Sequence, residues 1–396
     1  MPHIKVTPFP SHVLDRLVEE DPVVMFRAEA VEAGTAPSRE ELIGMDFEGE
    51  RFVLELHKRA EAWLIKPDKA TRPLDVNRIK RSLAYLAERG RLEVQHENIA
   101  ISANKPPLAE AFNKRIDDFE APDFGGRPLA IEVGFGSGRH LLYQAKKHPE
   151  ILHIGIEIHT PSAQQVLKQI ELQGLTNVWV VNYDARLLLE MLPSNVATAV
   201  YVHFPVPWDK KPHRRVISDA FVAQALRVLS PGGVLELRTD SERYYRYALE
   251  VFSRPESSRF DVSKNHEAAI RSKYEDRWQR QAKNIYTLSL HADEESPELT
   301  QAFDFRFSRP LKPLDALLAL PEKAMLRSDH FVHFERRYRM QGEEGALVKC
   351  SFGSFDRPEH KLLLVRGGTA EYYPQPPVRS RTNAHAHHTI GECIYA

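Results

Sequence analysis

IEVGFGSGRHL, at residues 131–141, stands between the β-rich run RPLAIEV and the helix-like run RHLLYQAKKH. Its glycines, Gly134, Gly136 and Gly138, predict a strand, a tight turn and the start of a helix. Glycine lets the backbone come close to a ligand, and the first N–H groups of a helix are free to bind acceptor atoms. The pattern therefore favours a nucleotide-like cofactor site over its alternative, a turn that needs glycine only for its geometry.

Acidic residues stand at the ends of the next two strand-like runs. HIGIEI carries Glu157 at its end, about 20 residues after the last glycine, where a carboxylate can accept hydrogen bonds from both hydroxyls of a ribose. VWVVNYDA ends in Asn182, Asp184 and Ala185, where an acceptor can meet the exocyclic amine of an adenine. Asp184 could instead only cap the following helix. Taken with the glycines, these strand ends predict an adenosine-containing ligand.

The spacing of the glycines narrows the choice of cofactor. A dinucleotide site usually has the pattern GxGxxG, in which the third glycine lets helix and strand pack around a pyrophosphate. This chain has GxGxG followed by Arg139. That spacing favours S-adenosylmethionine, which has no pyrophosphate, with its methionine end over the glycine turn.

Length and composition favour a soluble cytoplasmic protein of two or three domains. The chain has 396 residues and 42% hydrophobic content. No apolar run reaches the roughly 18 residues of a membrane span, and the first residues do not resemble a signal peptide. Cys350 and Cys393 are the only cysteines, too few for a disulfide framework or a zinc site.

The basic residues are unevenly distributed, although the net charge is only −1. Residues 1–125 hold 18 Lys and Arg against 23 Asp and Glu, whereas residues 205–283 hold 16 against 11. This modest basic excess gives weak support for a nucleic-acid partner.

Three regions follow one another along the chain. Residues 1–125 mix short β-like runs with one helix and predict an α+β region that ends in the turn-rich APDFGGRP. Residues 126–310 alternate strands and amphipathic helices, the pattern of a parallel α/β sheet, and NIYTLSL predicts a late edge strand. Residues 311–396 are β-rich and end in a stretch that we expect to be loosely ordered.

An aromatic and basic loop follows the fourth strand-like run of the middle region. Pro205 and Pro207 predict an extended segment at the crevice of the sheet, and Trp208 adds an aromatic face. Five basic residues follow: Lys210, Lys211, His213, Arg214 and Arg215. An aromatic face beside positive charge suits a nucleobase and its phosphates. The alternative is a solvated basic loop that leads into a helix.

Six motifs in this order resemble those of the bacterial tRNA (guanine-N7)-methyltransferases. They are GFGSGR, GIEI, NxDA, FPxPWxKKxH, PGGxLxLxTD and SxYE, and they cover roughly residues 126–290. The resemblance implies a Rossmann-like, seven-stranded methyltransferase domain, S-adenosylmethionine as methyl donor and tRNA as acceptor. The reaction implied is methylation of N7 of a guanosine in the tRNA variable loop. A methyltransferase acting on another RNA or a small molecule, and a non-catalytic RNA-binding protein, are the alternatives.

The resemblance also implies roles for individual residues. Those expected around the cofactor are Gly134, Gly136, Gly138, Glu157, Asn182, Asp184 and Ala185. Those expected around the tRNA and its target guanosine are Lys210, His213, Arg214, Asp240, Ser272 and Glu275. Family members usually have FPDPW, with an aspartate that is called catalytic, where this chain has Val206. Asp240, Glu275 and Asp209 are therefore the candidates for a catalytic carboxylate.

For three further groups of histidines and tyrosines, we expect structural rather than functional roles. His385, His387 and His388 lie in the polar tail, so we expect them to bind no metal. We expect Tyr372 and Tyr373 to be surface aromatics of a β-rich region. The tyrosines of a helix predicted over residues 241–252 are expected to pack against the sheet.

Overall fold

The computed structural model describes residues 1–31, 39–71, 73, 75–101, 110–255, 259–266, 283–299, 303–355 and 357–396. The chain divides into two compact units. One consists of Met1–Asn104 together with Phe303–Ala396, and the other of Lys105–Ala302. Among the described residues, no helix combines the length and the apolar character needed to cross a membrane.

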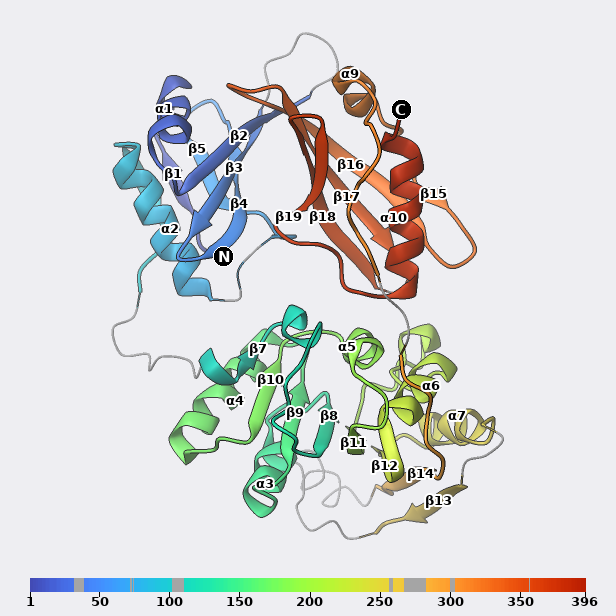
Figure 1. Ribbon diagram of the computed structural model, residues 1–396. Helices are drawn as coiled ribbons and strands as arrows, with labels where there is room; N and C mark the ends of the chain where they lie inside the picture. The colour runs from blue at the N-terminus through green and yellow to red at the C-terminus, as the bar shows by residue number, and fades with distance from the viewer. Residues whose placement is uncertain are drawn as a thin grey trace. The chain divides into compact units, whose positions relative to one another are not determined.

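The unit of residues 105–302 contains one eight-stranded sheet in the order β13-β14-β12-β11-β8-β9-β10-β7 (Figure 1). Its strands are β7 (Asn113–Lys114), β8 (Leu129–Val133), β9 (Leu152–Ile156), β10 (Val178–Val181), β11 (Ala197–His203), β12 (Leu229–Thr239), β13 (Arg259–Lys264) and β14 (Tyr286–Ala292). Its helices are η1 (Glu110–Phe112), η2 (Ile116–Phe119), α3 (Arg139–Lys147), α4 (Thr160–Gln173), α5 (Ala185–Met191), η3 (Pro212–Arg214), α6 (Asp219–Val228) and α7 (Glu242–Phe252).

Strands β10, β9, β8, β11 and β12 are parallel, and β14 runs antiparallel to both β12 and β13. Every residue of β8 and β9 is buried, as expected for central strands of a parallel sheet that is covered by helices. Helices α3 and α4 pack on β9 and β10, whereas α6 and α7 pack on β12 and β14. The predicted α/β, Rossmann-like methyltransferase fold is therefore confirmed, with the two-residue β7 added at one edge.

One strand in this unit differs from the prediction. NIYTLSL forms β14, which is not the edge strand of the sheet. The edge strand is β13, which pairs with β14 along the whole length of β13. The β13 sequence, RFDVSK, is polar and largely exposed, so it lacks the apolar signal by which a strand is recognised in the sequence.

The other unit is built on one sheet, in the order β19-β18-β17-β16-β2-β3-β4-β5-β1-β6, with β15 paired to β16. Its strands are β1 (Ile4–Val6), β2 (Val24–Ala30), β3 (Glu40–Phe47), β4 (Glu50–His57), β5 (Trp63–Pro67), β6 (Val94–Glu97), β15 (Met325–Leu326), β16 (Phe331–Met340), β17 (Gly345–Gly353), β18 (Pro358–Arg366) and β19 (Thr369–Tyr373). Its helices are α1 (His12–Glu20), α2 (Val76–Arg89), α9 (Leu314–Leu318) and α10 (Arg381–Ile394).

The two halves of this unit repeat one pattern, which the sequence does not reveal. In each half a short helix precedes four antiparallel strands, and a helix of 14 residues follows them. The halves meet where β2 pairs antiparallel with β16, so the strand order on one side of this junction mirrors the order on the other. The flanking regions that the sequence analysis separated, residues 1–125 and 311–396, thus contribute strands to the same sheet.

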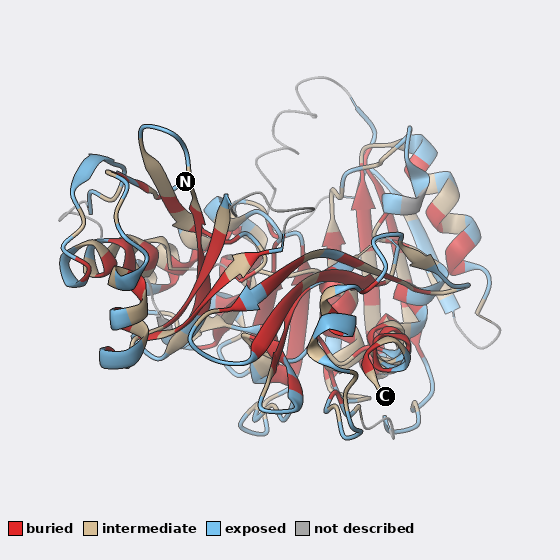
Figure 2. Ribbon diagram, turned by 90° about the horizontal axis from the view of Figure 1, so that it is seen from above, coloured by how far each residue is buried: buried red, intermediate tan, exposed pale blue. Residues whose placement is uncertain are grey.

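The C-terminal region is more ordered than expected. The stretch predicted to be loose contains α10, which begins with a side-chain cap from Ser380 and buries Ala386, Ile390 and Ile394. Buried residues run along the strands of the sheets, as the red segments in Figure 2 show. Tyr372 and Tyr373 are 4% and 1% exposed, so their prediction as surface aromatics was wrong. These two neighbours point to opposite faces of β19 and fill two different cores, because side chains alternate along a strand.

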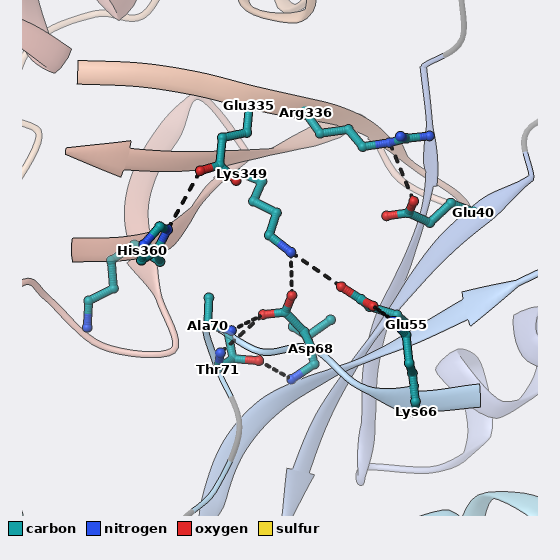
Figure 3. A network of polar contacts seen from close by, with 12 residues as sticks. Glu40, Glu55, Lys66, Asp68, Ala70, Thr71, Glu335, Arg336, Lys349 and His360 are labelled. Carbon is teal, nitrogen blue, oxygen red and sulfur yellow. Dashed lines mark hydrogen bonds and ion pairs between the residues drawn. The ribbon is translucent and has the colours of Figure 1, made fainter. Parts of the chain in front are cut away.

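A buried ionic network joins the two halves of the same sheet (Figure 3). Lys349 of β17 pairs with Asp68, and its Nζ lies 3.3 Å from Oε1 of Glu55 on β4. Lys66 Nζ lies 3.0 Å from the other oxygen of Glu55. Burial alone would lower the pKa of Lys349, but the charges of Asp68 and Glu55 outweigh it and raise that pKa. Lys349 therefore compensates two carboxylates that the N-terminal half buries.

His153, the second residue of β9, makes stability depend on pH. It is 3% exposed, its Nε2 has no hydrogen-bond partner among the described residues, and burial lowers its pKa from 6.5 to about 4. Between these two values the unfolded chain binds the proton and the folded chain does not. The contribution of neutral His153 is therefore complete above pH 6.5 and is lost as the pH falls to 4.

We expect the free energy of unfolding to decrease by about 3 kcal/mol from this group over that range, at 1.36 kcal/mol per unit of pKa shift. Urea unfolding at a series of pH values, for the wild type and His153→Leu, measures it. The difference between the two curves isolates His153 from other titrating groups. Parallel curves from pH 7 to 4.5 would show that His153 is not the group responsible.

Candidate cofactor and substrate site

The glycine turn connects the end of β8 to the start of α3. Gly134, Gly136 and Gly138 have φ angles of 72°, 52° and 72°, in the left-handed region that favours glycine. A Cβ on Gly134 would meet nothing within 4 Å, so the backbone is open there to an approaching ligand. A Cβ on Gly138 would lie 2.4 Å from Val166 Cγ2, so this glycine also lets α4 pack closely. The turn thus has the two properties predicted for it, a tight conformation and an accessible backbone.

Glu157 follows β9 and lies directly against the glycine turn. Its Oε2 accepts a hydrogen bond of 2.9 Å from the Gly136 N–H, and its Oε1 accepts one of 2.9 Å from the His159 N–H. The residue is 8% exposed. The carboxylate is therefore held beside the turn on which the cofactor is expected, which is the arrangement that the sequence spacing predicted. Its contact with a ribose stays a prediction.

The end of β10 is tied to the end of β9. Asn182 Nδ2 donates to the Glu157 carbonyl over 2.6 Å, and Asn182 Oδ1 accepts from Thr160 Oγ1 over 2.9 Å. Asp184 caps α5 by accepting from the Arg186 N–H, and it forms an ion pair of 2.8 Å with the Arg186 guanidinium. Helix capping, the alternative weighed for Asp184, is thus present in the structure. An adenine contact of Asp184, and of the buried Ala185 that begins α5, stays a prediction.

The loop after β11 presents an aromatic and basic surface. Phe204 and Trp208 have positive φ angles of 52° and 45°, which are unusual for bulky residues and show that the loop is held in a specific conformation. The Arg214 guanidinium lies 5.2 Å from the centroid of the Trp208 ring. Lys210, Lys211 and Arg214 are exposed. His213 lies within η3, and its side chain is outside the described structure.

Arg215 organises this loop, a role that the sequence analysis missed. It is 5% exposed, and its Nε donates to the Pro207 carbonyl over 2.8 Å. Its guanidinium lies 4.5 Å and 5.2 Å from the ring centroids of Tyr247 and Tyr244 on α7, and 3.6 Å from Asp209. Tyr244 is fully buried, so the expected packing role of this residue is confirmed. Tyrosines spaced by three on one helix face, beside a run of arginines, were the available sequence signal.

The candidate carboxylates differ in their surroundings. Asp240 follows β12 and pairs with Lys283 over 3.0 Å. Asp209 is about half-exposed and faces Arg215 and Arg243, the latter over 4.0 Å. Val206 is 59% exposed. Ser272 and Glu275 lie outside the described residues, so the structure places Asp209 and Asp240 beside basic groups and leaves the other two untested.

Two histidines that were not predicted link the glycine turn to the loop after β11. His140, in the first turn of α3, lies 2.8 Å from Glu132, and His203, the last residue of β11, lies 2.7 Å from Glu236. Their rings lie 4.6 Å apart. Burial alone would raise the pKa of Glu236, but the hydrogen bond with His203 outweighs it and lowers that pKa. The pair fixes the end of β11 against the start of α3.

Comparison with known proteins adds an independent line of evidence. Residues 126–288 match a family model described as "Putative methyltransferase". The chain is 43% identical to the tRNA (guanine-N(7)-)-methyltransferase of Wolinella succinogenes over 90% of this chain and 91% of that protein. It is 38% identical to the enzyme of that name from Helicobacter hepaticus, over 88% and 89% of the two chains. Both matches extend far beyond the region of the family model.

Proposed function

We propose that this chain, which belongs to the tRNA (guanine-N7)-methyltransferase family, transfers the methyl group of S-adenosylmethionine to N7 of a guanosine in the tRNA variable loop. The observation that carries the proposal is the 43% identity to a relative of that name over about nine-tenths of both chains. The glycine turn and Glu157, which lie together at the ends of β8 and β9, support the cofactor. We also propose a cytoplasmic location, which a tRNA substrate supports.

The site fits S-adenosylmethionine, which supplies a methyl group on a sulfonium. Gly134 leaves open space beside the turn for the methionine end. We assign the carboxylate oxygens of Glu157 to the ribose hydroxyls, and Asn182 and Asp184 at the end of β10 to the adenine. The protein's task is to hold the donor in one position, because transfer requires the methyl carbon to lie in line with the attacking atom.

The acceptor needs alignment more than activation. Guanine N7 has a lone pair and carries no proton, so methyl transfer needs no general base. A positive charge develops on the purine as the bond forms, and a nearby carboxylate stabilises it. Asp240 and Asp209 are the described candidates for that role, in place of the aspartate that Val206 replaces. We assign Lys210 and Arg214 to the phosphates of the tRNA and Trp208 to stacking on a base.

The test is methyl transfer to unmodified tRNA with labelled S-adenosylmethionine, followed by separation of the product nucleosides by mass. We expect N7-methylguanosine. Asp240→Asn and Asp209→Asn, compared under the same conditions, identify which carboxylate takes part. Cofactor binding without any methylated tRNA nucleoside would contradict the proposal and favour the alternative of a changed substrate.

Replacing Lys210 and Arg214 together with alanine should weaken tRNA binding mainly at low salt. Each phosphate contact contributes roughly 0.7–0.9 to the slope of log affinity against log salt concentration, so the double variant should lower the slope by about 1.5. Filter binding at several salt concentrations measures it. A matched control is Lys146→Ala with Lys147→Ala, which removes the same charge from the last turn of α3. Equal slopes for the two double variants would show that the basic loop makes no phosphate contacts.

Arg215→Lys should lower kcat/KM for tRNA by about tenfold to a hundredfold while leaving the Kd of S-adenosylmethionine unchanged. Lysine keeps the charge but loses the guanidinium plane over the tyrosines and the Nε donor to Pro207, so the loop loses its fixed conformation. Arg214→Lys, the same change at the exposed neighbour, is the control. Steady-state kinetics and cofactor titration give both quantities. An equal loss for both variants would show that Arg215 has no positioning role beyond that of its exposed neighbour.

A further inference from the structure

Asp329, His330 and His385 bring their side chains together on the surface of the sheet built from both chain ends. β15 and β16 form a hairpin, and the Arg327 N–H closes its turn by donating to the His330 carbonyl over 2.9 Å. Asp329 and His330 are the last two residues of this turn. His385 comes from α10, more than 50 residues later in the chain. The turn and the helix thus supply the three side chains from separate elements.

The carboxylate of Asp329 lies between the two imidazoles. Its Oδ1 is 2.8 Å from His330 Nδ1, and its Oδ2 is 2.6 Å from His385 Nδ1. One ligand atom from each of the three residues lies within 4.8 Å of the others, the only such group of three among the described residues. The sequence analysis expected His385 to lie in a loose tail and to bind no metal. The structure instead fixes it on a capped helix beside two further ligands.

We propose that Asp329, His330 and His385 bind a divalent transition-metal ion, best matched by Zn²⁺. Two imidazole nitrogens and one carboxylate oxygen form a donor set that suits zinc and its neighbours, and three protein ligands leave a coordination position for water. Zinc holds its N and O ligands at about 2.0–2.2 Å, which places neighbouring donors of a tetrahedron about 3.3 Å apart. The hydrogen-bonded separations of 2.6 and 2.8 Å are about half an ångström shorter than this, and all three ligand atoms lie within 4.8 Å of one another, so the side chains need to shift by about 1.5 Å or less to enclose the ion.

The surroundings support a built site. The His330 side chain is 9% exposed, and its Nε2 lies 3.0 Å from the Thr389 hydroxyl. Thr389 is one helical turn after His385, on the same face of α10. A hydroxyl that accepts the Nε2–H fixes the tautomer and leaves the Nδ1 lone pair for the ion, as outer-shell partners of metal-bound histidines do. Asp329 and His385 are 33% and 47% exposed, so the ion can enter from solvent and keep a water ligand.

Such an ion would fasten the last helix of the chain to the β15–β16 hairpin. It would act on the unit of residues 1–104 and 303–396, and it is independent of the methyl donor. A ligand that binds only the folded chain raises the unfolding temperature, so zinc should stabilise the full-length protein by an amount that grows with the logarithm of its free concentration over Kd.

The experiment is calorimetric titration of the EDTA-stripped, full-length protein with ZnCl₂, together with thermal unfolding in zinc or EDTA. We expect one Zn²⁺ per chain and a higher Tm in zinc. Asp329→Asn and His385→Ala should abolish the binding or weaken it at least about tenfold, and Thr389→Val should weaken it about 10- to 100-fold. Asp329→Asn preserves the shape of the side chain, so it tests the site even where a truncation impairs folding.

The control is His388→Ala, because His388 is 75% exposed on the same helix and pairs with Glu392 rather than with Asp329. It should bind zinc as the wild type does. The proposal is overturned if the wild type binds no zinc, if Asp329→Asn and His385→Ala bind it unchanged, or if His388→Ala is the variant that loses it.

Discussion

Glu157→Ala is expected to weaken binding of S-adenosylmethionine by about 1–3 kcal/mol, because the donors that this buried carboxylate serves are left without an acceptor. The variant removes the proposed ribose contact and also the hydrogen bond that Glu157 makes to the Gly136 N–H. The glycine turn then lacks the carboxylate that holds it to the end of β9. Calorimetric titration with S-adenosylhomocysteine, which has no methyl group to transfer, measures the affinity without turnover.

Glu157→Gln separates the two contributions. Glutamine keeps the size of the side chain and one acceptor oxygen, but its amide nitrogen cannot accept a hydrogen bond from Gly136 or from a ribose hydroxyl. We expect an intermediate affinity. Circular dichroism and the unfolding midpoint establish that both variants are folded. Wild-type affinity in folded Glu157→Ala would remove Glu157 from the cofactor site.

Lys349→Met is expected to lower the free energy of unfolding by about 2–4 kcal/mol. Removing one partner of a buried ion pair costs about 3–5 kcal/mol, and the one-fifth exposure of Lys349 reduces that cost. Methionine fills similar space, so the loss reports charge rather than a cavity. Asp68 would then lose its cation, whereas Glu55 would keep the ion pair with Lys66, and both carboxylates belong to the N-terminal half of the sheet. Urea denaturation of the full-length protein measures the change.

A double-mutant cycle makes this prediction specific. Asp68→Asn in the Lys349→Met background removes the carboxylate that has lost its cation and should recover part of the lost stability. Lys323→Met, the same substitution at an exposed position, is the matched control and should change stability by less than about 0.5 kcal/mol. Losses of equal size at positions 349 and 323 would contradict the assignment of the network as a stabilising contact between the halves.

The fold of the middle unit could be predicted because its signals are local. The runs that became β8 and β9 are mostly apolar, and the glycines fall where the chain leaves the sheet. The carboxyl ends of parallel strands lie at one edge of a sheet. Glu157 and Asn182, which follow two such strands, can therefore be predicted to lie at the same edge without information on distant contacts. The nearness of Glu157 to Gly136 follows from the same rule.

The shared sheet and its internal repeat could not be predicted in this way. The pairing of β2 with β16 joins residues about 300 positions apart, and the sequence of neither strand indicates which strand it pairs with. The sequences of the polar β13 and the histidine-rich α10 have no strong periodicity of apolar residues. These two elements are instead held in place by contacts with β14 and with the core around Ile390. Tertiary context overrides local propensity at such positions.

The site was predicted less completely than the fold. The residue types at the strand ends predicted the cofactor-binding part of the site. Arg215, however, stands in a run of exposed basic residues and could not be distinguished from them by composition. Its burial depends on Tyr244 and Tyr247, which belong to another element. The contact of His140 with His203 likewise joins two elements that are separate in the sequence.

The junction of β2 and β16 has a consequence for the order of events during synthesis. The ribosome makes β2 about 300 residues before its partner, which at 5–20 residues per second is a delay of roughly 15–60 s. During that time β2 is an open edge, and Phe26, Leu42 and Val53 lack the C-terminal side chains that cover them in the finished core. An uncovered edge of this kind invites pairing with other chains. The nascent N-terminal half is therefore open to such pairing until β16 has been made, and a message truncated before residue 331 yields a product with this edge permanently exposed.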